Sequence, residues 1–246
     1  FRVELFKGKS HFGENVTFDE TLPTNYLADE VIDDNKVNEL LAKKYNETIV
    51  IAEDDSEILA YLKDELSTNF RVIAVNNGYD AVKAVMDDEV SLILSDVLMP
   101  ALNGFQLCSN IKSNIATCHI PIVLLTALSD DNQRIYGIAE GADEYIHKPF
   151  NMQYVRLKII RIIEERKRLA STFAQKFGRL TRHEAANLPC VDDVFRDKLF
   201  NLIEAQHSDS NFKIELMSDM LGMSRILLYR KITSIFGMSP SDLLRN

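Results

Sequence analysis

Five polar side chains in the middle of the sequence have the types and spacing needed to bind a divalent cation and to transfer a phosphoryl group. They follow or end short apolar runs, and they are Glu53, Asp54, Asp96, Thr126 and Lys148. Crowded carboxylates raise one another's pKa unless a cation neutralises them, and hard oxygen ligands suit Mg²⁺. A carboxylate can itself be the nucleophile and become an acyl phosphate, with a metal, an ammonium group and a hydroxyl neutralising the charge. Each residue alone is most often incidental, but the whole set indicates a phosphoryl-transfer site.

The elements that must position these side chains alternate regularly. Apolar runs lie at residues 49–52, 72–75, 92–94, 122–125 and 145–146. Amphipathic stretches lie between them at 56–68, 78–88, 104–116 and 130–140, and a fifth helix begins near Asn151. Buried strands separated by helices predict a parallel sheet with right-handed crossovers. We therefore expect a flavodoxin-like, doubly wound α/β domain with five parallel strands over residues 47–165, and a site at the carboxyl ends of its strands.

Charge divides the chain into unlike parts. Residues 47–150 carry 17 acidic and 6 basic side chains, net −11, whereas residues 151–246 carry 16 basic and 11 acidic ones, net +5. The acidic part suits a divalent cation and the basic part suits a polyanion. We expect no membrane contact, because no apolar stretch is long enough to span a bilayer. The three cysteines do not have the spacing of a zinc site and are expected to be reduced thiols of a cytoplasmic protein. A longer parent protein could still be anchored in the inner membrane through another segment.

The C-terminal part is predicted to be helical. One helix should run from about Asn151 to Phe177, with an apolar stripe from Val155 to Leu169. Its first half should pack on the sheet, and its second half is either solvated or a dimerising surface. Residues 166–191 are taken as a linker helix. Residues 192–246 should form a small all-α unit. In it, Gly222 ends one helix, Ser224 caps the next helix and Gly237 ends that helix, which is the pattern of a helix-turn-helix.

The N-terminal part has a different composition. Residues 1–12 alternate briefly, as a single strand would, and residues 13–46 are rich in acidic side chains and are predicted to be a linker. A strand without a partner is unstable. Residues 1–12 are therefore expected to be the end of a preceding domain.

Residues 47–165 resemble the receiver domain of response regulators. The resemblance rests on Ile49 to Asp55, Ser95 to Pro100 with Asn103 and Gly104, Leu125 to Ala127, and Tyr145 to Phe150. It implies that Asp96 accepts a phosphoryl group from the phosphohistidine of a sensor kinase. It also implies that Asp54, Asp96 and the backbone carbonyl of Leu98 hold Mg²⁺, with Glu53 acting through water. Thr126 and Lys148 would bind phosphoryl oxygens, Tyr145 would change rotamer on activation, and the Lys148–Pro149 peptide would be cis.

Residues 192–246 resemble the first helix-turn-helix of an AraC-type DNA-binding domain, cut off before the second. The resemblance rests on Met217 to Arg225, Leu228 to Lys231 and Gly237 to Pro240. It implies that Ile226, Tyr229 and Arg230 face bases, and that Arg225 and Lys231 lie near phosphates. Residues 1–12 resemble the last strand of a kinase ATPase domain. This order resembles hybrid two-component proteins, in which sensor kinase, receiver and DNA-binding parts share one chain.

The function expected from this combination is a phosphorelay switch that controls transcription and forms a homodimer when phosphorylated. The fragment itself is not expected to be an enzyme. Two alternatives remain: a receiver that only drains phosphate, and an aspartyl-phosphate phosphotransferase or phosphatase. Phosphatases of the dehalogenase type need a second acid two residues after the nucleophile, where this chain has Leu98.

Overall fold

The computed structural model describes residues 34–127, 141–177, 192–206 and 212–245. The predicted kinase remnant, the first part of the predicted linker, the helix expected at 130–140 and residues 178–191 lie outside the described residues.

Five parallel strands form the sheet at the centre of the larger unit. They are β1 (Thr48–Ala52), β2 (Arg71–Val75), β3 (Leu92–Asp96), β4 (Ile122–Thr126) and β5 (Glu144–His147), in the order β2-β1-β3-β4-β5. The chain order reverses at the boundary between β1 and β3, so the ends of these two strands flank a crevice in which α/β proteins bind ligands. The predicted flavodoxin-like fold class is confirmed.

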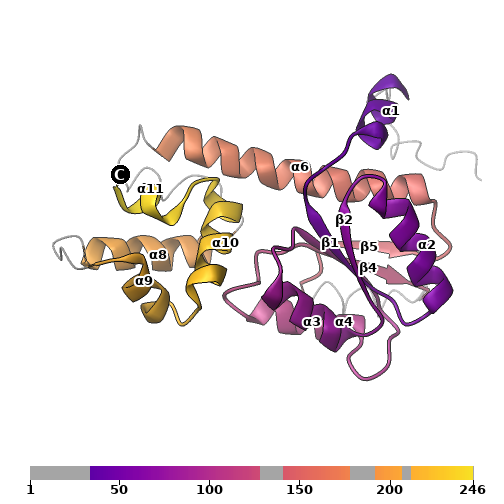
Figure 1. The fold of residues 1–246 in the computed structure, drawn as a ribbon, viewed down its shortest axis with the longest axis horizontal. Coiled ribbons are helices and arrows are strands. Elements are labelled where there is room, and N and C mark those ends of the chain that lie inside the picture. Colours follow the sequence, from indigo (N-terminus) through magenta and orange to yellow (C-terminus); the bar gives the residue numbers. More distant parts are fainter. Residues whose placement is uncertain (1–33, 128–140, 178–191, 207–211, 246) are drawn as a thin grey trace, which may run out of the picture.

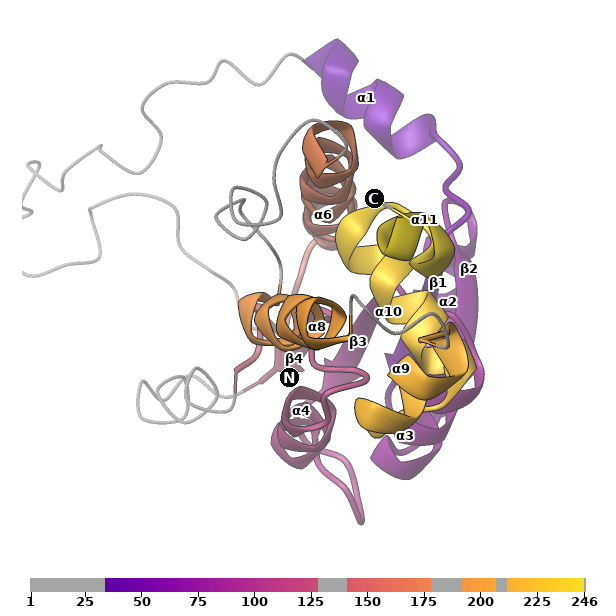
Figure 2. The ribbon, with the colours of Figure 1, turned by 90° about the vertical axis from the view of Figure 1, so that its left-hand side faces the viewer.

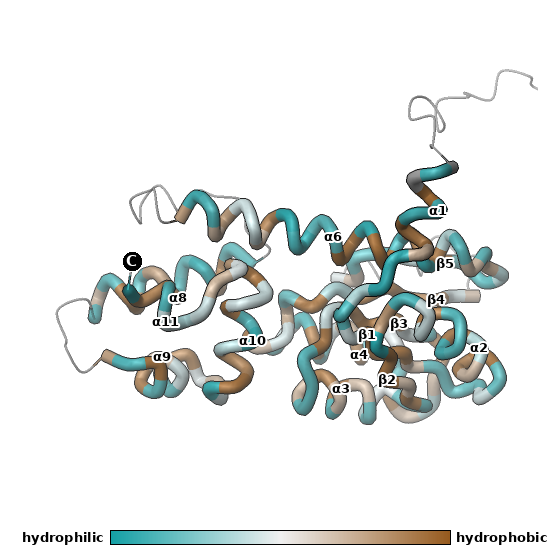
Figure 3. The backbone as a smooth tube through the Cα atoms, turned by 45° about the horizontal axis from the view of Figure 1, so that its top comes forward, coloured by the Kyte–Doolittle hydropathy of each residue, from teal (hydrophilic) through white to brown (hydrophobic). Residues whose placement is uncertain are grey.

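Helices cover both faces of the sheet (Figure 1). The helices α2 (Ser56–Ser67) and α6 (Met152–Phe177) pack on one face, and α3 (Gly78–Asp87) and α4 (Gly104–Ser113) pack on the other. Ile49, Ile93 and Leu124 are 0% exposed, because a central strand of such a sheet is buried on both sides. Figure 3 shows this pattern as apolar central strands beneath helices that alternate between polar and apolar residues.

Short polar side chains start these helices at the residues where the strands end. Asp55 accepts hydrogen bonds from the backbone N–H groups of Glu57 and Ile58, which satisfies donors that the first turn of α2 would otherwise leave open. Asn103 forms a capping box with Gln106 at the start of α4. Such caps fix where each loop leaves the sheet, and the loops carry the candidate site.

The predicted acidic linker ends in packed structure. Its last residues include helix α1 (Asp34–Ala42), which contacts α6, and Tyr45, which is buried. The Tyr45 ring stacks on Phe70 at 5.2 Å, and its hydroxyl donates to Glu164 on α6. Residues 34–46 therefore extend the folded domain instead of forming an open connection.

The smaller unit consists of α8 (Asp193–Ala205), α9 (Ile214–Met220), α10 (Arg225–Phe236) and α11 (Pro240–Arg245), packed against the far half of α6 (Figures 1 and 2). Ala170, Phe173 and Phe177 of α6 are buried there, and the Phe173 ring lies 4.8 Å from that of Phe236. The second half of α6 is therefore neither solvated nor a free dimerisation stripe, which corrects both sequence-based alternatives. The apolar spacing continues past Leu169 through Phe173 and Phe177, and this continuation serves the smaller unit.

None of the helices in the described ranges combines the length and the apolar character that crossing a bilayer would need.

Candidate functional site

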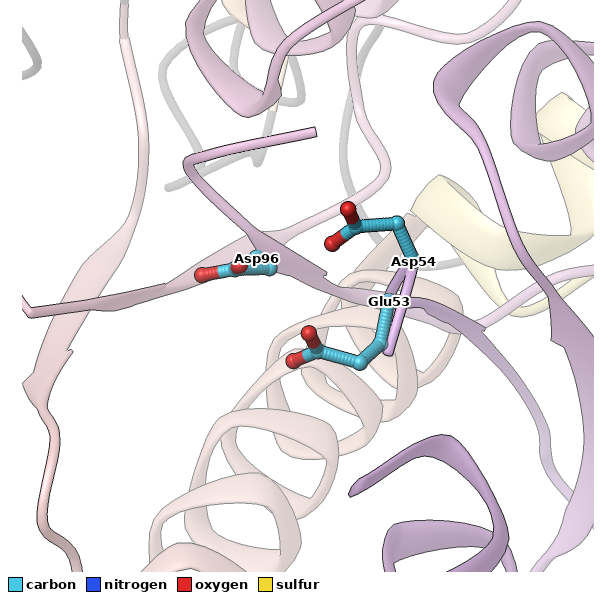
Figure 4. A group of neighbouring side chains, drawn as sticks. All are labelled: Glu53, Asp54 and Asp96. Atoms are coloured by element: carbon cyan, nitrogen blue, oxygen red, sulfur yellow. The ribbon is translucent and has the colours of Figure 1, made fainter. Parts of the chain in front are cut away.

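The three acidic side chains expected at the sheet edge come together. Glu53 and Asp54 follow β1, Asp96 ends β3, and one carboxylate oxygen from each lies within 4.8 Å of the others. Figure 4 shows the three carboxylates gathered at the ends of these two strands. Glu53 is 1% exposed and Asp96 is 7% exposed, whereas Asp54 is exposed. The group is therefore open to solvent on the side of Asp54.

Lys148 brings one positive charge to this group. Its Nζ lies 2.8 Å from Glu53 Oε2 and 3.2 Å from Asp96 Oδ1. The Lys148–Pro149 peptide is cis, as predicted, and it stands where β5 leaves the sheet. Burial opposes the ammonium charge, but the hydrogen bond to Glu53 and the charges of both acids outweigh burial and raise the pKa of Lys148.

Burial also raises the pKa of Glu53. The negative charge of Asp96 acts in the same direction, whereas the hydrogen bond from Lys148 opposes the rise. One lysine thus faces three carboxylates, which leaves a negative excess. A donor set of hard oxygens with a net negative charge fits Mg²⁺, so Glu53, Asp54 and Asp96 are the residues that would hold or orient the ion.

The backbone around Asp96 is fixed by close packing. The Val97 N–H donates to Asp96 Oδ1 at 2.9 Å, and the Gly104 N–H donates to the Val97 carbonyl at 3.0 Å. A Cβ atom at Gly104 would lie 2.9 Å from Val97 Cα, so a glycine is required where α4 begins against the end of β3. This contact holds Asp96 at the sheet edge.

The remaining expected site residues lie on the neighbouring strand ends. Thr126 is 4% exposed at the end of β4, where its partner on β5 is His147. Its carbonyl accepts from the Lys148 N–H at 2.7 Å, so Thr126 and Lys148 are neighbours across the sheet. Tyr145 lies on β5 and is partly buried, and Leu98 is 57% exposed two residues after Asp96. The roles of these residues, including that of the Leu98 carbonyl, stay predictions.

The five side chains expected to contact DNA lie on α10 in different environments. Ile226 and Tyr229 are 63% and 50% exposed, and Arg225 forms an ion pair of 3.0 Å with Glu215. Arg230 donates to the carbonyl oxygens of Met86 and Asp87, at 3.3 and 2.8 Å, in the last turn of α3. The predicted recognition helix therefore touches the larger unit.

The assignment of Lys231 to a phosphate contact is wrong in this arrangement. Lys231 is 0% exposed, and its Nζ lies 2.6 Å from Asp192 Oδ2. It also donates to the Ile115 carbonyl, lies 3.2 Å from Cys118 Sγ, and stands over the Phe195 ring. The local sequence pattern could not reveal this, because Lys231 directly follows the half-buried Arg230 and its own partners are far away in the sequence.

Asp192 and Cys118 are the residues of this contact that the sequence did not reveal. Asp192 Oδ2 accepts from the Cys118 thiol at 3.0 Å, and Asp192 Oδ1 accepts from the Phe195 N–H at the start of α8. Burial raises the pKa of Asp192, but the hydrogen bonds from Cys118, Lys231 and Phe195 together outweigh burial and lower it. The capping position of Asp192 was the available signal, but it does not predict a partner 74 residues away.

Comparisons with known proteins agree with this geometry. Residues 49–160 match the family described as response regulator receiver domain. The chain is 33% identical over its whole length to a protein of Formosa agariphila named as a histidine kinase, of which it covers 18%. Over 46% of its length it is 38% identical to the transcriptional regulatory protein GltR of Pseudomonas aeruginosa, of which it covers 47%. The chain thus spans less than half the length of these relatives.

A solved structure is similar to the same part of the chain. The receiver domain of a signal-transduction histidine kinase from Syntrophus aciditrophicus is 33% identical, with a TM-score of 0.46, over 48% of this chain and 91% of that one. The family match spans β1 to the first part of α6 and includes every acidic residue of the site. Residues 49–160 form a response regulator receiver domain.

Proposed function

We propose that Asp96 accepts a phosphoryl group from a phosphohistidine, and that this modification switches a DNA-binding output carried by residues 192–246. The observation that carries the proposal is the meeting of Glu53, Asp54 and Asp96 with Lys148 at the boundary between β1 and β3. In the transfer, a carboxylate oxygen of Asp96 forms the new O–P bond. The P–N bond of the donor breaks, and the imidazole that leaves takes up a proton.

The charges of the site suit this reaction. A phosphoryl group brings three oxygens that share negative charge, and catalysis of its transfer consists mainly of positioning and neutralising that charge. Lys148 Nζ lies 3.2 Å from Asp96 Oδ1 and can neutralise an oxygen of the incoming group. The Thr126 hydroxyl would donate to a second oxygen, and Mg²⁺ held by Asp54, Asp96 and the Leu98 carbonyl would neutralise a third.

Intact-mass spectrometry with a small acyl phosphate tests the acceptor. The wild-type protein should gain one phosphoryl group in the presence of Mg²⁺, and chelating the metal should prevent the gain. Asp96→Ala should gain none, whereas the control Asp64→Ala, which alters an exposed aspartate of α2, should behave like the wild type. Equal labelling of Asp96→Ala would remove Asp96 as the acceptor.

The DNA-binding part of the proposal rests on the helical unit. Helix α9 ends at Met220, Gly222 follows with φ +68°, and Ser224 caps α10 by accepting from the Leu227 N–H. Two helices joined by such a glycine turn form a helix-turn-helix, whose second helix enters the major groove. Arg225, Ile226, Tyr229 and Arg230 are the residues of α10 that we infer to contact DNA.

The parent protein, by this proposal, is a hybrid histidine kinase whose own phosphohistidine serves as the donor on the cytoplasmic side of the membrane. The relative named as a histidine kinase, matched over the whole chain, supports this. The alternative is a receiver that drains phosphate without contacting DNA. Binding of DNA by the helical unit distinguishes the two, since a phosphate drain needs no such binding.

A further inference from the structure

The guanidinium group of Arg230 contacts the receiver. The NH1 and NH2 atoms reach the carbonyl oxygens of Met86 and Asp87, which belong to the last turn of α3. The final carbonyl groups of a helix lack partners inside it and form its negative pole. Arg230 therefore donates hydrogen bonds to the negative C-terminal end of α3, in the same way that an arginine binds an anion.

The receiver adds acidic side chains at the same place. Asp87, Asp88 and Glu89 follow one another at the end of α3. Glu89 lines a groove together with Arg225, Ile226, Tyr229 and Arg230 of α10. The face of α10 that is expected to contact DNA thus faces a concentration of negative charge from the receiver, as it would face the DNA backbone.

We propose that residues 86–89 of the receiver and DNA are mutually exclusive partners of the same face of α10, so that the docked arrangement excludes DNA. The inference rests on the DNA-binding output proposed above. A helix about 10–12 Å across fills a major groove about 12 Å wide, which leaves no room for a protein segment against its flank. Arg230 cannot cap α3 and contact a base in the same complex.

The second contact between the two units suggests that docking is reversible. Lys231 and Asp192 both belong to the helical side, and docking removes their ion pair from water. Desolvation of an ion pair can cost more than its attraction provides. The hydrogen bond from Lys231 to the Ile115 carbonyl and the burial of Ala116 against the helical core offset this cost. The two arrangements can therefore lie close in free energy.

Cys118 reports the docked state. Its thiol donates to Asp192 Oδ2 across the contact, and burial there raises its pKa, which slows its reaction with thiol reagents. Cys108 is 0% exposed in the receiver core. With Cys190→Ser in every protein, the rate of thiol labelling follows the exposure of Cys118.

Two receiver variants should undock α10 without altering the phosphoryl site or the DNA-contacting residues. Asp87→Asn with Glu89→Gln removes negative charge beside Arg230. Ala116→Gln places a larger polar side chain where Ala116, 5% exposed, packs into the helical core. The control, Glu57→Gln with Asp64→Asn, makes the same change of net charge on exposed residues of α2.

Thiol labelling and the affinity for a mixed-sequence DNA duplex at low salt are measured on the Cys190→Ser parent, the two variants and the control. If about one molecule in ten is undocked, both variants should bind DNA about tenfold more tightly than the control and label Cys118 faster. Faster labelling with unchanged DNA affinity would overturn the inference and leave the DNA-binding output standing. Unchanged labelling would overturn it as well. Faster labelling without DNA binding by any protein would remove the DNA-binding output, and the inference with it.

Discussion

Leu98 is exposed beside Asp96, and its side chain can neither donate nor accept a hydrogen bond. It therefore cannot orient a water molecule for attack on an acyl phosphate at Asp96. We expect the phosphorylated protein to lose its phosphoryl group slowly and Leu98→Asn to lose it several-fold faster. The decay of intact mass with time measures both rates, and Leu98→Met, which stays apolar, is the control. A Leu98→Asn protein that decays no faster than Leu98→Met would exclude this role.

His119 couples stability to pH because it is buried. Burial first, and then the nearby charges of Lys231 and Arg166, lower its pKa to about 3. Between pH 6.5 and about 3, His119 binds a proton in the unfolded chain but not in the folded chain, so the free energy of unfolding falls as the pH falls. From pH 7 to 5 we expect His119 to cost about 2 kcal/mol of the free energy of unfolding.

Urea unfolding at both pH values checks this expectation. His119→Gln should lose most of the difference, because glutamine does not titrate. His147→Gln removes an exposed imidazole at the end of β5 and should keep the wild-type difference. Equal pH dependence of the His119→Gln and wild-type proteins would contradict the assignment.

The meeting of the three carboxylates with Lys148 could be predicted because it depends on strand ends. Glu53, Asp96 and Lys148 each lie within two residues of the end of an apolar run, and parallel strands bring such positions to one edge. The environment of Lys231 could not be predicted in this way. A lysine next to Arg230 has the same local pattern whether it faces solvent or a second unit, and only the packing of that unit decides.

At the scale of elements, two glycines of the helical unit have the same backbone conformation but different surroundings. Gly222 and Gly237 have φ of +68° and +66°, a region that costs a residue with a Cβ roughly 1–2 kcal/mol. A Cβ at Gly222 would meet no atom within 4 Å, whereas one at Gly237 would lie 2.9 Å from the Ala170 carbonyl oxygen on α6.

Alanine at these positions should therefore have unequal effects. Gly222→Ala should cost about 1 kcal/mol through the backbone alone. Gly237→Ala should cost more, because α10 must also move away from α6. Thermal unfolding of the helical unit compares the two, and equal losses would mean that the end of α10 does not need its close approach to α6.

The strands and helix α6 followed from apolar spacing, but helix α1 and the partner of the far half of α6 did not. The start of α6 on the sheet agrees with the stripe from Val155, since its spacing matches a helix packed on one side. The burial of Phe173 and the packing of α1 depend on surfaces far away in the sequence. Periodicity shows that a helix has an apolar face, but it does not show what covers that face.

At the scale of the whole molecule, the negative charge of residues 47–150 limits the affinity for DNA. Residues 47–150 carry a net charge of −11, against +5 on residues 151–246. The DNA-binding output proposed above has one recognition helix, α10, in the described residues, so we expect weak, salt-sensitive binding with a Kd of roughly 10⁻⁴ to 10⁻⁶ M. Fluorescence anisotropy over a series of salt concentrations measures this. Arg225→Ala should weaken the binding and flatten the salt dependence, and nanomolar binding to one sequence at physiological salt would contradict the expectation.

Helix α6 belongs to both hydrophobic cores and runs without interruption from Met152 to Phe177. Its 26 residues make a rod about 39 Å long. A rod seated on the sheet at one end and in the helical unit at the other acts as a lever. A tilt of about 10° at the sheet would move the far end by about 7 Å, more than one turn of helix. A small adjustment where α6 rests on the sheet would thus suffice to pull Arg230 out of reach of α3.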